Sequence, residues 1–362
     1  MLRLQTIVKS FAFFVLASAS YIQAHHCPTY RQYEGGFADG LKISADYLYW
    51  QVLQDNMAYA AWIPGGFTSV PTIPAISIDK QLRLVEPKFN WDSGFRIGLD
   101  YTTQCSDWEF GFYWTRFHKN EKSRVCDSHN GIFPFADPIF GLIEILVTKP
   151  AGFSRAAFSN WRFQYDTLDF QVGRSCGICE CLKVRPYVGV KAASILQKQK
   201  IHFSKVTTTS VRRIIPGIPV MARDKRINNF YGIGLSFGTD MMWTFAPHWN
   251  LSSGLSGAML YSRSHFANKP IIISKPITGP ITVEVDVVNK KARRLRPMLD
   301  AFVSLDWDTC FCENRVDISI GYEMQYWWNQ WNTSNSLVDG LFSNAHGDLM
   351  LHGLTVHASI SF

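Results

Sequence analysis

The last thirteen residues of the chain read Met350-Leu351-His352-Gly353-Leu354-Thr355-Val356-His357-Ala358-Ser359-Ile360-Ser361-Phe362. From Leu354 to Phe362, apolar side chains occupy every second position, and small or polar side chains stand between them. A period of two is that of a β-strand, and its two unlike faces indicate two different environments. A soluble sheet protein can also end in this way by chance. The rest of the chain therefore has to show whether the pattern is general.

The same alternation recurs along the chain. Val316, Ile318 and Ile320, for example, alternate with Asp317 and Ser319. Further segments with this pattern are 95–101, 108–115, 231–241, 249–261 and 299–307. Segments of roughly ten residues that interleave lipid-facing and lumen-facing positions are typical of transmembrane β-barrels. A final strand that closes on Phe is also typical of barrels from Gram-negative outer membranes.

A β-sandwich would alternate as well, so the ends and the polar faces of these segments are informative. Several apolar faces begin or end on an aromatic residue: Trp108, Trp114, Trp249, Tyr261, Trp307 and Trp328. Membrane barrels carry such rings at the headgroup level, whereas a sandwich core would hold them in mid-strand. Charged residues such as Arg96, Glu109 and Glu323 lie in mid-strand, where they would be costly unless they faced water. The sequence predicts an all-β transmembrane antiparallel barrel.

The N-terminus has the pattern of an export signal. Arg3 and Lys9 precede the short apolar block 11–17, and small residues follow it. We expect a signal peptide over residues 1–24, cleaved after residue 19 or 24, then a periplasmic segment over 25–40 and the barrel over 41–362. No uncharged apolar run reaches the roughly 18 residues that a membrane helix needs. The predicted location is the outer membrane of a Gram-negative cell.

Short and long connections alternate between the predicted strands. The short turns lie near 103–106, 175–182, 246–248 and 308–314, and the long connections near 56–86, 119–155, 205–224, 268–291 and 329–347. Outer-membrane barrels have short periplasmic turns and long extracellular loops. The clear strands number about ten, an even number as expected for bacterial barrels. The β-like stretches 75–79 and 281–287 either raise the total toward sixteen or project outward as extracellular structure.

The chain has eight cysteines, and seven fall on the side of the short turns. These disulfide candidates are Cys27, Cys105, Cys176, Cys179, Cys181, Cys310 and Cys312, while Cys126 falls in a long connection. Such spacing would suggest zinc in the cytosol. In an oxidising periplasm, disulfides within the turns or to neighbouring proteins are favoured. We therefore expect no metal and no cofactor.

Charged residues on the polar faces are the candidates for lining a pore. They are Arg96, Asp100, Glu109, Arg162, Asp166, Arg185, Lys191, Asp300 and Glu323. Walls of mixed sign make a polar channel with a modest ion preference. In a ten-stranded barrel many of these groups would pair and nearly fill the interior, whereas a wider barrel would leave a path for water.

Three segments resemble a known family. Residues 45–51 with 57–60, residues 89–99 and residues 114–118 are similar to the pore-forming major outer membrane proteins of the Legionella type and their chlamydial relatives, and the resemblance extends over about 45–362. The resemblance implies an abundant general porin that self-associates or is cross-linked by disulfides, which in chlamydia-like bacteria stiffen the envelope. The predicted function is passive diffusion of small hydrophilic solutes and ions. The alternative is a non-conducting structural or adhesive barrel.

The remaining features bear on partners and on catalysis. The net charge is +7, and basic residues gather in the outer connections, for example Lys122, Arg124, Arg223, Lys225 and Arg293. They either hold phosphates of lipopolysaccharide or form a solvated loop surface. Nucleic acid is not an expected partner of an exported chain without a recognised binding motif. The histidines are scattered outside any catalytic pattern, so we do not expect an enzyme.

Overall fold

The computed structural model describes residues 40–62, 83–103, 108–127, 132–133, 151–209, 220–269, 271–274, 282–285, 288–311, 314–333 and 345–362. Its long strands are β1 (Gly40–Gln54), β4 (Trp91–Thr102), β5 (Trp108–Cys126), β8 (Ala156–Arg174), β10 (Leu182–Thr209), β11 (Val220–Ala246), β12 (Trp249–Asn268), β15 (Val288–Phe311), β16 (Asn314–Thr333) and β17 (Ala345–Ser361). The short ones are β2 (Ala60–Trp62), β3 (Arg83–Val85), β6 (Ile132–Phe133), β7 (Ala151–Phe153), β9 (Cys176–Cys179), β13 (Ile271–Ser274) and β14 (Thr282–Val285). The predicted signal peptide and the stretch 75–79 lie outside the described residues, as does all but the last residue of the predicted segment 25–40.

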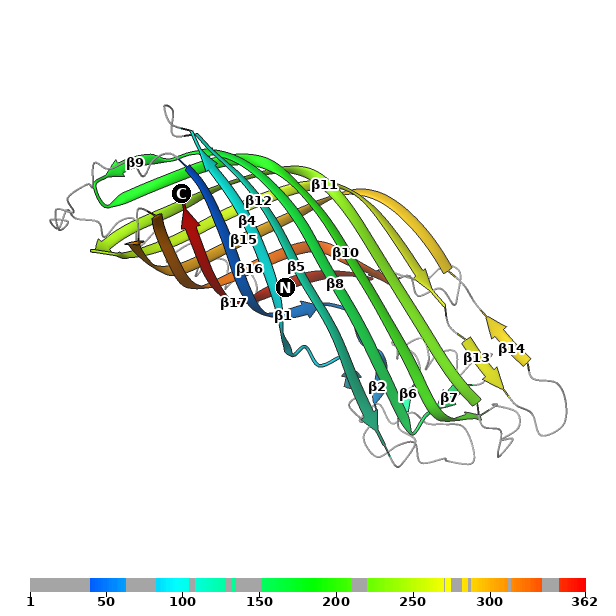
Figure 1. Cartoon of the computed structure of the whole chain (residues 1–362). Coiled ribbons are helices and arrows are strands. Elements are labelled where there is room, and N and C mark those ends of the chain that lie inside the picture. Colours follow the sequence, from blue (N-terminus) through cyan, green and yellow to red (C-terminus); the bar gives the residue numbers. More distant parts are fainter. Residues whose placement is uncertain are drawn as a thin grey trace.

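The ten long strands of the described part close into an antiparallel barrel (Figure 1). Each pairs with the neighbours that precede and follow it in this series, and β17 pairs with β1 from Lys42 opposite Ser361 to Gln54 opposite Leu349. The predicted fold class is confirmed. The stretch 281–287 contributes β14, which pairs with β13, and β13 extends the edge of β11 beyond the ring. It therefore adds a projecting hairpin and not two further barrel strands.

The outside of the barrel carries the apolar band that lipid requires. Along β11, Tyr231, Ile233, Leu235 and Phe237 are all more than half exposed, although they are large and apolar. The other long strands show similar rows of exposed apolar side chains. Trp249 lies directly opposite Trp307 near the short turns, as expected for an aromatic girdle. No helix in the described residues is long and apolar enough to cross a membrane.

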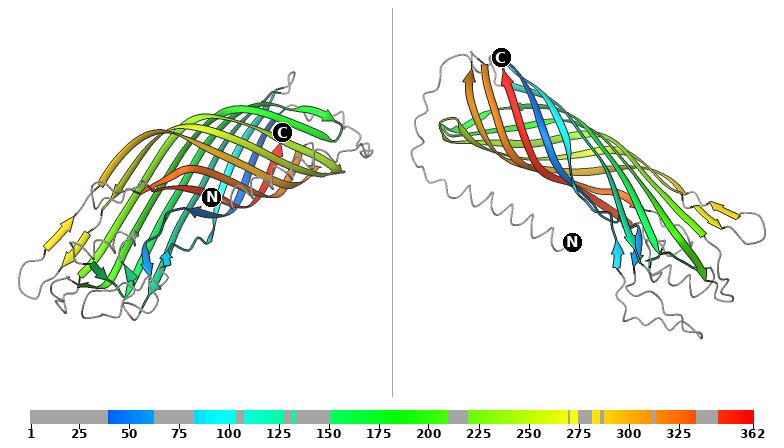
Figure 2. Two further views of the ribbon diagram at one scale, coloured as in Figure 1. Left: turned by 180° about the vertical axis from the view of Figure 1, so that it is seen from behind. Right: turned by 60° about the horizontal axis from the view of Figure 1, so that its bottom comes forward.

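The strands differ greatly in length, so the two ends of the barrel differ. β10 has 28 residues and β11 has 27, whereas β4 has 12. Because about 9–11 residues suffice to cross a bilayer, the longest strands project on the side of the long connections (Figures 1 and 2). A small sheet of β3, β2 and β6 lies there, and Tyr59, Ile201 and Phe203 belong to one buried apolar cluster beside it.

Candidate functional site

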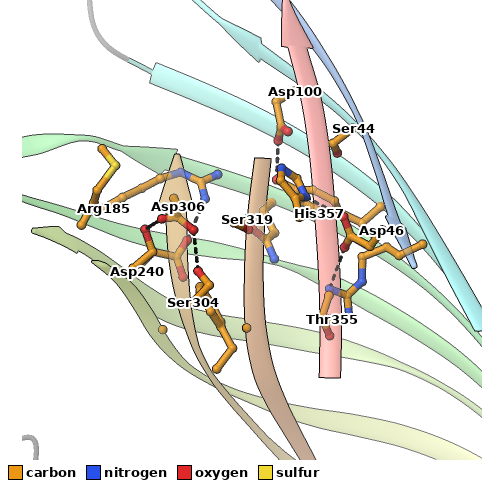
Figure 3. A pocket seen from close by; sticks show the side chains of 18 of the residues that line it. Ser44, Asp46, Asp100, Arg185, Asp240, Ser304, Asp306, Ser319, Thr355 and His357 are labelled. Carbon is orange, nitrogen blue, oxygen red and sulfur yellow. Dashed lines mark hydrogen bonds and ion pairs between the residues drawn. The ribbon is translucent and has the colours of Figure 1, made fainter. Parts of the chain in front are cut away.

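The lumen contains a polar chamber at the end with the short turns. The chamber has a volume of about 680 Å³, and side chains from all ten long strands line it (Figure 3). It extends from Gly40 and Phe362 at the barrel end to Arg96, Asp300 and Glu323 further inside. Alternation places these groups there: every second residue of each strand points inward. The chamber is therefore a direct product of the polar faces.

Acidic groups outnumber basic groups around the chamber. Its lining holds nine carboxylates, which are Asp46, Asp100, Glu109, Asp169, Asp240, Asp300, Asp306, Asp317 and Glu323, and six cationic side chains, which are Lys42, Arg96, Lys183, Arg185, Lys191 and Arg315. The lining thus contains three more carboxyl groups than cationic side chains. The whole chain carries +7. The balance of charged side chains in the chamber lining is thus opposite in sign to that of the whole chain.

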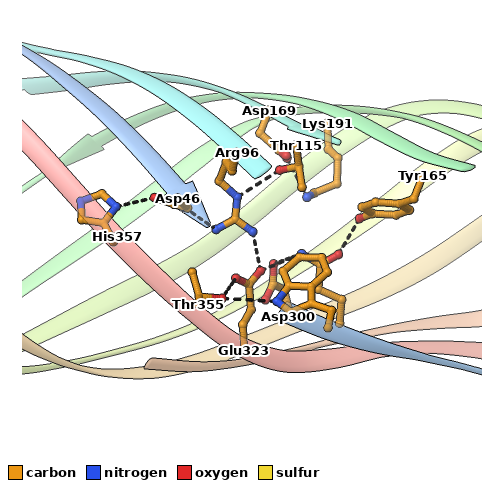
Figure 4. A network of polar contacts seen from close by, with 12 residues as sticks. Asp46, Arg96, Thr115, Tyr165, Asp169, Lys191, Asp300, Glu323, Thr355 and His357 are labelled. Atoms are coloured by element: carbon orange, nitrogen blue, oxygen red, sulfur yellow. Dashed lines mark hydrogen bonds and ion pairs between the residues drawn. The ribbon is translucent and has the colours of Figure 1, made fainter. Parts of the chain in front are cut away.

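Arg96 is the centre of a network at the inner end of the chamber (Figure 4). Its guanidinium donates to Asp46 at 3.2 Å and to Glu323 at 2.6 Å, and its Nε donates to Thr115 at 3.0 Å. His357 Nδ1 lies 2.6 Å from the other oxygen of Asp46. The network therefore ties strands β1, β4, β5, β16 and β17 together through their inward faces.

Two further cations, Arg185 and Lys191, form three ion pairs between the network and the barrel end. Arg185 on β10 contacts Glu109 on β5 at 2.6 Å and Asp240 on β11 at 2.9 Å, so one cation holds carboxylates from two strands that are three places apart in the ring. Lys191 contacts Asp169 at 2.8 Å across the pair β8 and β10. These pairs compensate charges that face one another across a narrow space. The chamber is consequently lined by paired groups of mixed sign.

An apolar cluster fills the lumen beyond the Arg96 network. We call its aromatic members the aromatic layer: Trp50, Phe117, Trp161, Phe163, Tyr165, Phe230, Trp327 and Trp331. All eight are at most 1% exposed. Tyr165 on β8 meets Trp327 on β16 with ring centroids 6.0 Å apart, and these strands are five places apart around a ring of ten. Side chains from opposite walls therefore touch, and the layer closes the lumen.

The layer and the network are in direct contact. The Arg96 guanidinium lies over the Trp50 ring, 5.8 Å from its centroid. Trp50 Nε1 donates to the Thr355 hydroxyl at 3.3 Å, and Thr355 donates to Glu323 at 3.5 Å. Tyr165 also donates its hydroxyl to Gln325, which in turn donates to Glu323 at 2.8 Å. A shift of the layer would thus change the position of the charged groups that face the chamber.

Two segments outside the regular ladder also enter the closed half. Asn56 and Asn329 have positive φ values of 60° and 53°, and after each of them the chain turns into buried positions. Gln199 donates to the Met57 carbonyl at 3.1 Å, and Asn228 donates to the Gln330 carbonyl at 2.6 Å. These hydrogen bonds fix both segments to the inward face of β10 and β11.

The first infolded segment is tightly enclosed. Met57, Ala58, Tyr59 and Ala60 are all less than 10% exposed, and Arg226 donates to the Ala58 carbonyl at 3.0 Å. Burial raises the pKa of the Tyr59 hydroxyl to about 12, so this group stays neutral over the physiological range. The segment is part of the packed interior and not a solvated loop.

The structure separates the predicted pore-lining residues into two groups. Those that line the chamber are Arg96, Asp100, Glu109, Arg185, Lys191, Asp300 and Glu323. The prediction for Arg162 and Asp166 is wrong, because both point outward from β8 while Trp161, Phe163 and Tyr165 point inward. Asp166 lies 3.7 Å from Arg116 and 3.5 Å from His118, which also point outward from β5.

The aromatic layer is the feature that sequence reasoning missed. A signal for it exists in β8, where apolar residues occupy odd positions at 161–165 and even positions at 168–172. The strand keeps one unbroken register with both neighbours over this stretch. The shift therefore marks one level along the strand. At this level the outer face passes from water into lipid, and the side chains of the inner face change from apolar to polar.

The described cysteines lie at both ends of the barrel. Cys176, Cys179 and Cys310 are exposed free thiols at the end with the short turns, and Cys181 beside them is buried and disulfide-bonded. Cys126 is exposed at the end of β5, on the opposite side. The other candidates, Cys27, Cys105 and Cys312, lie outside the described residues. The described residues contain no group of three or more His, Cys, Asp or Glu arranged to hold a metal ion.

Solved structures that resemble the barrel are distant. The outer membrane protease OmpT from Escherichia coli has a TM-score of 0.41 and 7% identity, over 90% of this chain and 97% of that one. A FadL homologue from Pseudomonas aeruginosa has a TM-score of 0.26 and 7% identity, over 89% of each chain. The toluene transporter TodX from Pseudomonas putida has a TM-score of 0.25 and 7% identity, again over 89% of each.

Comparison of the sequence with protein families identifies the family of this chain. A search of curated protein sequences finds no significant match. Residues 37–362, however, match the family described as Legionella pneumophila major outer membrane protein precursor. This range covers nearly the whole chain, including all ten barrel strands. The protein is an outer-membrane β-barrel, and it belongs to the Legionella major outer membrane protein family.

Proposed function

We propose that the protein is an outer-membrane channel that passes small hydrophilic solutes and ions, with the aromatic layer as its gate. The observation that carries the proposal is the chamber of about 680 Å³ lined by polar side chains from every barrel strand. Protein interiors are normally packed to high density, and unfilled space costs contact energy. A barrel with a purely structural role would be more stable if side chains filled this chamber. The absence of enzymatic activity is part of the same proposal.

The aromatic layer has the properties of a hydrophobic gate. Apolar constrictions block ions because water leaves them, and small displacements of their side chains restore a wet path. The infolded segments after Asn56 and Asn329 contribute Met57 and Trp331 to the apolar cluster. The segment after Asn56 has no barrel ladder partner and Gln330 lies in the interruption of the β16–β17 ladder, so side chains at both places can shift without breaking the closed ring. Opening is thus compatible with an intact barrel.

A closed structural barrel is the second candidate. The contact between Tyr165 and Trp327 across the ring favours it, as does the complete burial of Trp50 and Trp161. In such a protein the polar chamber would be a blind pocket open to the periplasm. The two candidates differ in one measurable property, which is conductance.

Planar bilayer recordings of the mature protein distinguish the two candidates. We compare the wild type with a variant that carries Tyr165→Ala and Trp327→Ala, and with Trp307→Ala as a control on the lipid-facing girdle. The channel proposal expects stepwise openings of the wild type and a much higher open probability in the layer variant. The control should behave as the wild type. A gel shift on heating shows that each protein is folded.

Two outcomes oppose the proposal. If the folded wild type never conducts while the layer variant does, the protein is a closed structural barrel. If neither conducts, the aromatic layer is not what blocks the lumen, and the gate assignment is wrong. Both results would leave the barrel itself and its family unaffected.

We also propose that thiols on the periplasmic side link the barrel to itself or to envelope proteins. Cys176, Cys179 and Cys310 support this idea, because they are exposed on one end of the barrel. Cells are lysed with a thiol-blocking agent and run on non-reducing gels. A ladder that collapses on reduction and shortens in a Cys310→Ser variant supports linkage. Migration as a monomer in every condition contradicts it.

A further inference from the structure

One sector of the outer surface has a sharp boundary between apolar and polar side chains. The strand registers align six outward residues in one row across β5, β8, β10, β11, β12 and β15: Trp114, Leu168, Ala192, Ile233, Tyr261 and Leu295. The next row toward the long connections contains Arg116, Asp166, Ser194, Tyr231, Arg263 and Arg293. The first row matches lipid tails and the second matches headgroups. The boundary therefore marks the outer edge of the membrane.

A groove lies on this boundary. Its volume is about 480 Å³, and residues of the two rows form most of its lining. Ala192 and Ser194 make a low floor, while Leu168 on one side and Ile233 and Tyr261 on the other form higher walls. The lining is almost wholly apolar on the membrane side. Its shape and chemistry suit a hydrocarbon chain that lies against the barrel.

Basic side chains lie at the upper edge of the groove and on the surface between it and the long connections. We call this set the basic belt: Arg162, Lys198, Lys200, Lys225, Arg263 and Arg293. All six point outward from their strands; Arg263 and Arg293 belong to the second row, and the other four lie further toward the long connections. Among the described residues of this sector, Asp166 is the only carboxylate that points outward. It already contacts Arg116 and His118. The belt consequently keeps a large positive excess.

The basic belt contains like charges in direct opposition. Lys200 is the cross-strand partner of Lys225, and Arg263 is that of Arg293. Lys198 is the partner of Arg162. Directly opposed like charges destabilise a sheet unless another group compensates them. An anion held between the strands would supply that compensation.

We propose that this sector binds lipopolysaccharide, with an acyl chain in the groove and glycolipid phosphates on the basic belt. The long connections place the sector on the extracellular side, and lipopolysaccharide forms the outer leaflet there. Charged phosphates favour basic side chains at the membrane surface. A second copy of the protein is a poor occupant, because two basic belts would repel each other. The proposal does not depend on whether the lumen conducts.

Binding is measured with purified rough lipopolysaccharide in detergent micelles, by native mass spectrometry of the full mature barrel. One variant carries Lys198→Gln and Lys200→Gln, and another carries Ala192→Phe, which fills the groove. Ala358→Phe adds the same ring to an exposed outward position on β17, and Arg174→Gln removes an exposed charge at the periplasmic end. These two variants are the matched controls.

The proposal expects the lysine variant to bind lipopolysaccharide at least about tenfold more weakly, because each basic residue at a membrane surface contributes roughly fivefold. Ala192→Phe should also weaken binding, because the added ring occupies the place of the acyl chain. The controls should bind as the wild type. Phosphatidylglycerol vesicles and inorganic phosphate should not compete effectively. Equal binding by the sector variants, or full competition by either anionic probe, overturns the proposal. If Ala192→Phe instead converts an oligomer to monomers without changing lipopolysaccharide binding, the occupant is a second copy and the proposal is wrong.

Discussion

Arg96 occupies the position on which most polar contacts in the lumen converge. Its partners Asp46 and Glu323 have side chains that are only 7% and 6% exposed. Paired with one cation, two such carboxylates are tolerable, but without it both become buried unpaired charges. The arrangement also holds His357 through Asp46. A single residue thus compensates two buried carboxylates at the inner end of the chamber.

Replacement of Arg96 by Ala should lower the free energy of unfolding by about 3–5 kcal/mol, which is typical when one partner of a buried ion pair is removed. The measurement is urea unfolding of the barrel in detergent micelles, followed by tryptophan fluorescence. The fluorescence should respond early, because Arg96 lies over the Trp50 ring.

Lys42→Gln is the matched control for this substitution. Lys42 also pairs with a lumen carboxylate, Asp317 at 3.5 Å, but the two side chains are 35% and 22% exposed. Exposed pairs of this kind contribute roughly 0–1 kcal/mol. If Arg96→Ala and Lys42→Gln lower the free energy of unfolding equally, burial does not make the Arg96 network more stabilising than an exposed ion pair.

At the scale of single strands, each element passes through two different environments. In the lipid-embedded part, apolar residues point outward and polar residues point inward. In the projecting part the order is reversed, since water is outside and the aromatic layer is inside. β8 shows the change between Tyr165 and Leu168 without any irregularity in its pairing.

This reversal explains which parts of the site the sequence could predict. Within the membrane the alternation assigns Arg96, Glu109 and Glu323 to the lumen, because lipid excludes charges from the other face. Above the membrane the same rule fails, because the outer face is in water and tolerates charges while the inner face packs in the aromatic layer. Arg162 and Asp166 were assigned inward for this reason, and the inward aromatic residues of β8 resembled a lipid-facing row.

Strand β16 contains a bulge that places two buried residues in the closed half of the lumen. Its ladder with β17 runs regularly to Trp327 and resumes at Trp331, and Asn329 between them has a φ of 53°. Asn tolerates the left-handed region better than branched residues do. The bulge turns Gln330 and Trp331 into the closed half of the lumen, where both are nearly fully buried.

Asn329→Val should therefore displace Trp331 from the aromatic layer, at a cost of about 1–2 kcal/mol for a branched residue in the left-handed region. Acrylamide quenching of tryptophan fluorescence should increase, because Trp331 loses its enclosure. Asn329→Gly keeps the backbone conformation accessible and should quench as the wild type does. If the Gly variant is quenched as strongly as the Val variant, the Asn329 side chain, and not the backbone conformation, holds Trp331 in place.

At the scale of the molecule, charge is divided between the inside and the outside. The chamber has an excess of three carboxylates in its lining, while basic residues dominate the outer surface above the membrane. The overall value of +7 therefore gives the wrong sign for the lumen. Neither composition nor loop charge predicts what an ion inside the barrel would meet.

Once open, the channel should prefer cations. The reversal potential in a tenfold gradient of KCl should have the sign expected for K⁺, since a net negative lining raises the local cation concentration. A variant with Asp100→Asn and Asp240→Asn should lose most of this preference, because both residues line the chamber. Substitution of the outward residues Arg263 and Arg293 by Gln should leave the potential unchanged. An anion preference in the wild type would contradict the prediction.

The orientation of the barrel gives another test. Cys126 and Cys310 are exposed free thiols at opposite ends, on β5 and β15 respectively. A membrane-impermeant maleimide should label Cys126 in intact cells and Cys310 only after the outer membrane is permeabilised. Single-cysteine variants make the two sites distinguishable. The reverse pattern would require the long connections to face the periplasm.

Strand number was the property of the whole molecule that the sequence left open. The stretch 281–287 has the alternation of a strand, but alternation does not specify a partner. In the structure its strand β14 pairs only with β13, within the described residues, and β13 merely extends β11. The ring closes at ten because β10 pairs directly with β11 along its length. Pairing between strands that are distant in the sequence cannot be predicted from the local alternation of apolar and polar residues.

The ring closure between β17 and β1 means that the barrel has no seam. The amide of Phe362 donates to the Leu41 carbonyl at 3.1 Å, so the two ends of the described barrel lie side by side. A circular permutant that joins Phe362 to Gly40 and opens the short turn between β11 and β12 would keep every ladder of the ring. It would, however, move the terminal aromatic residue into the middle of the chain. If this permutant still folds to a heat-modifiable barrel, the closed set of ladders and not the order of the strands along the chain determines the fold.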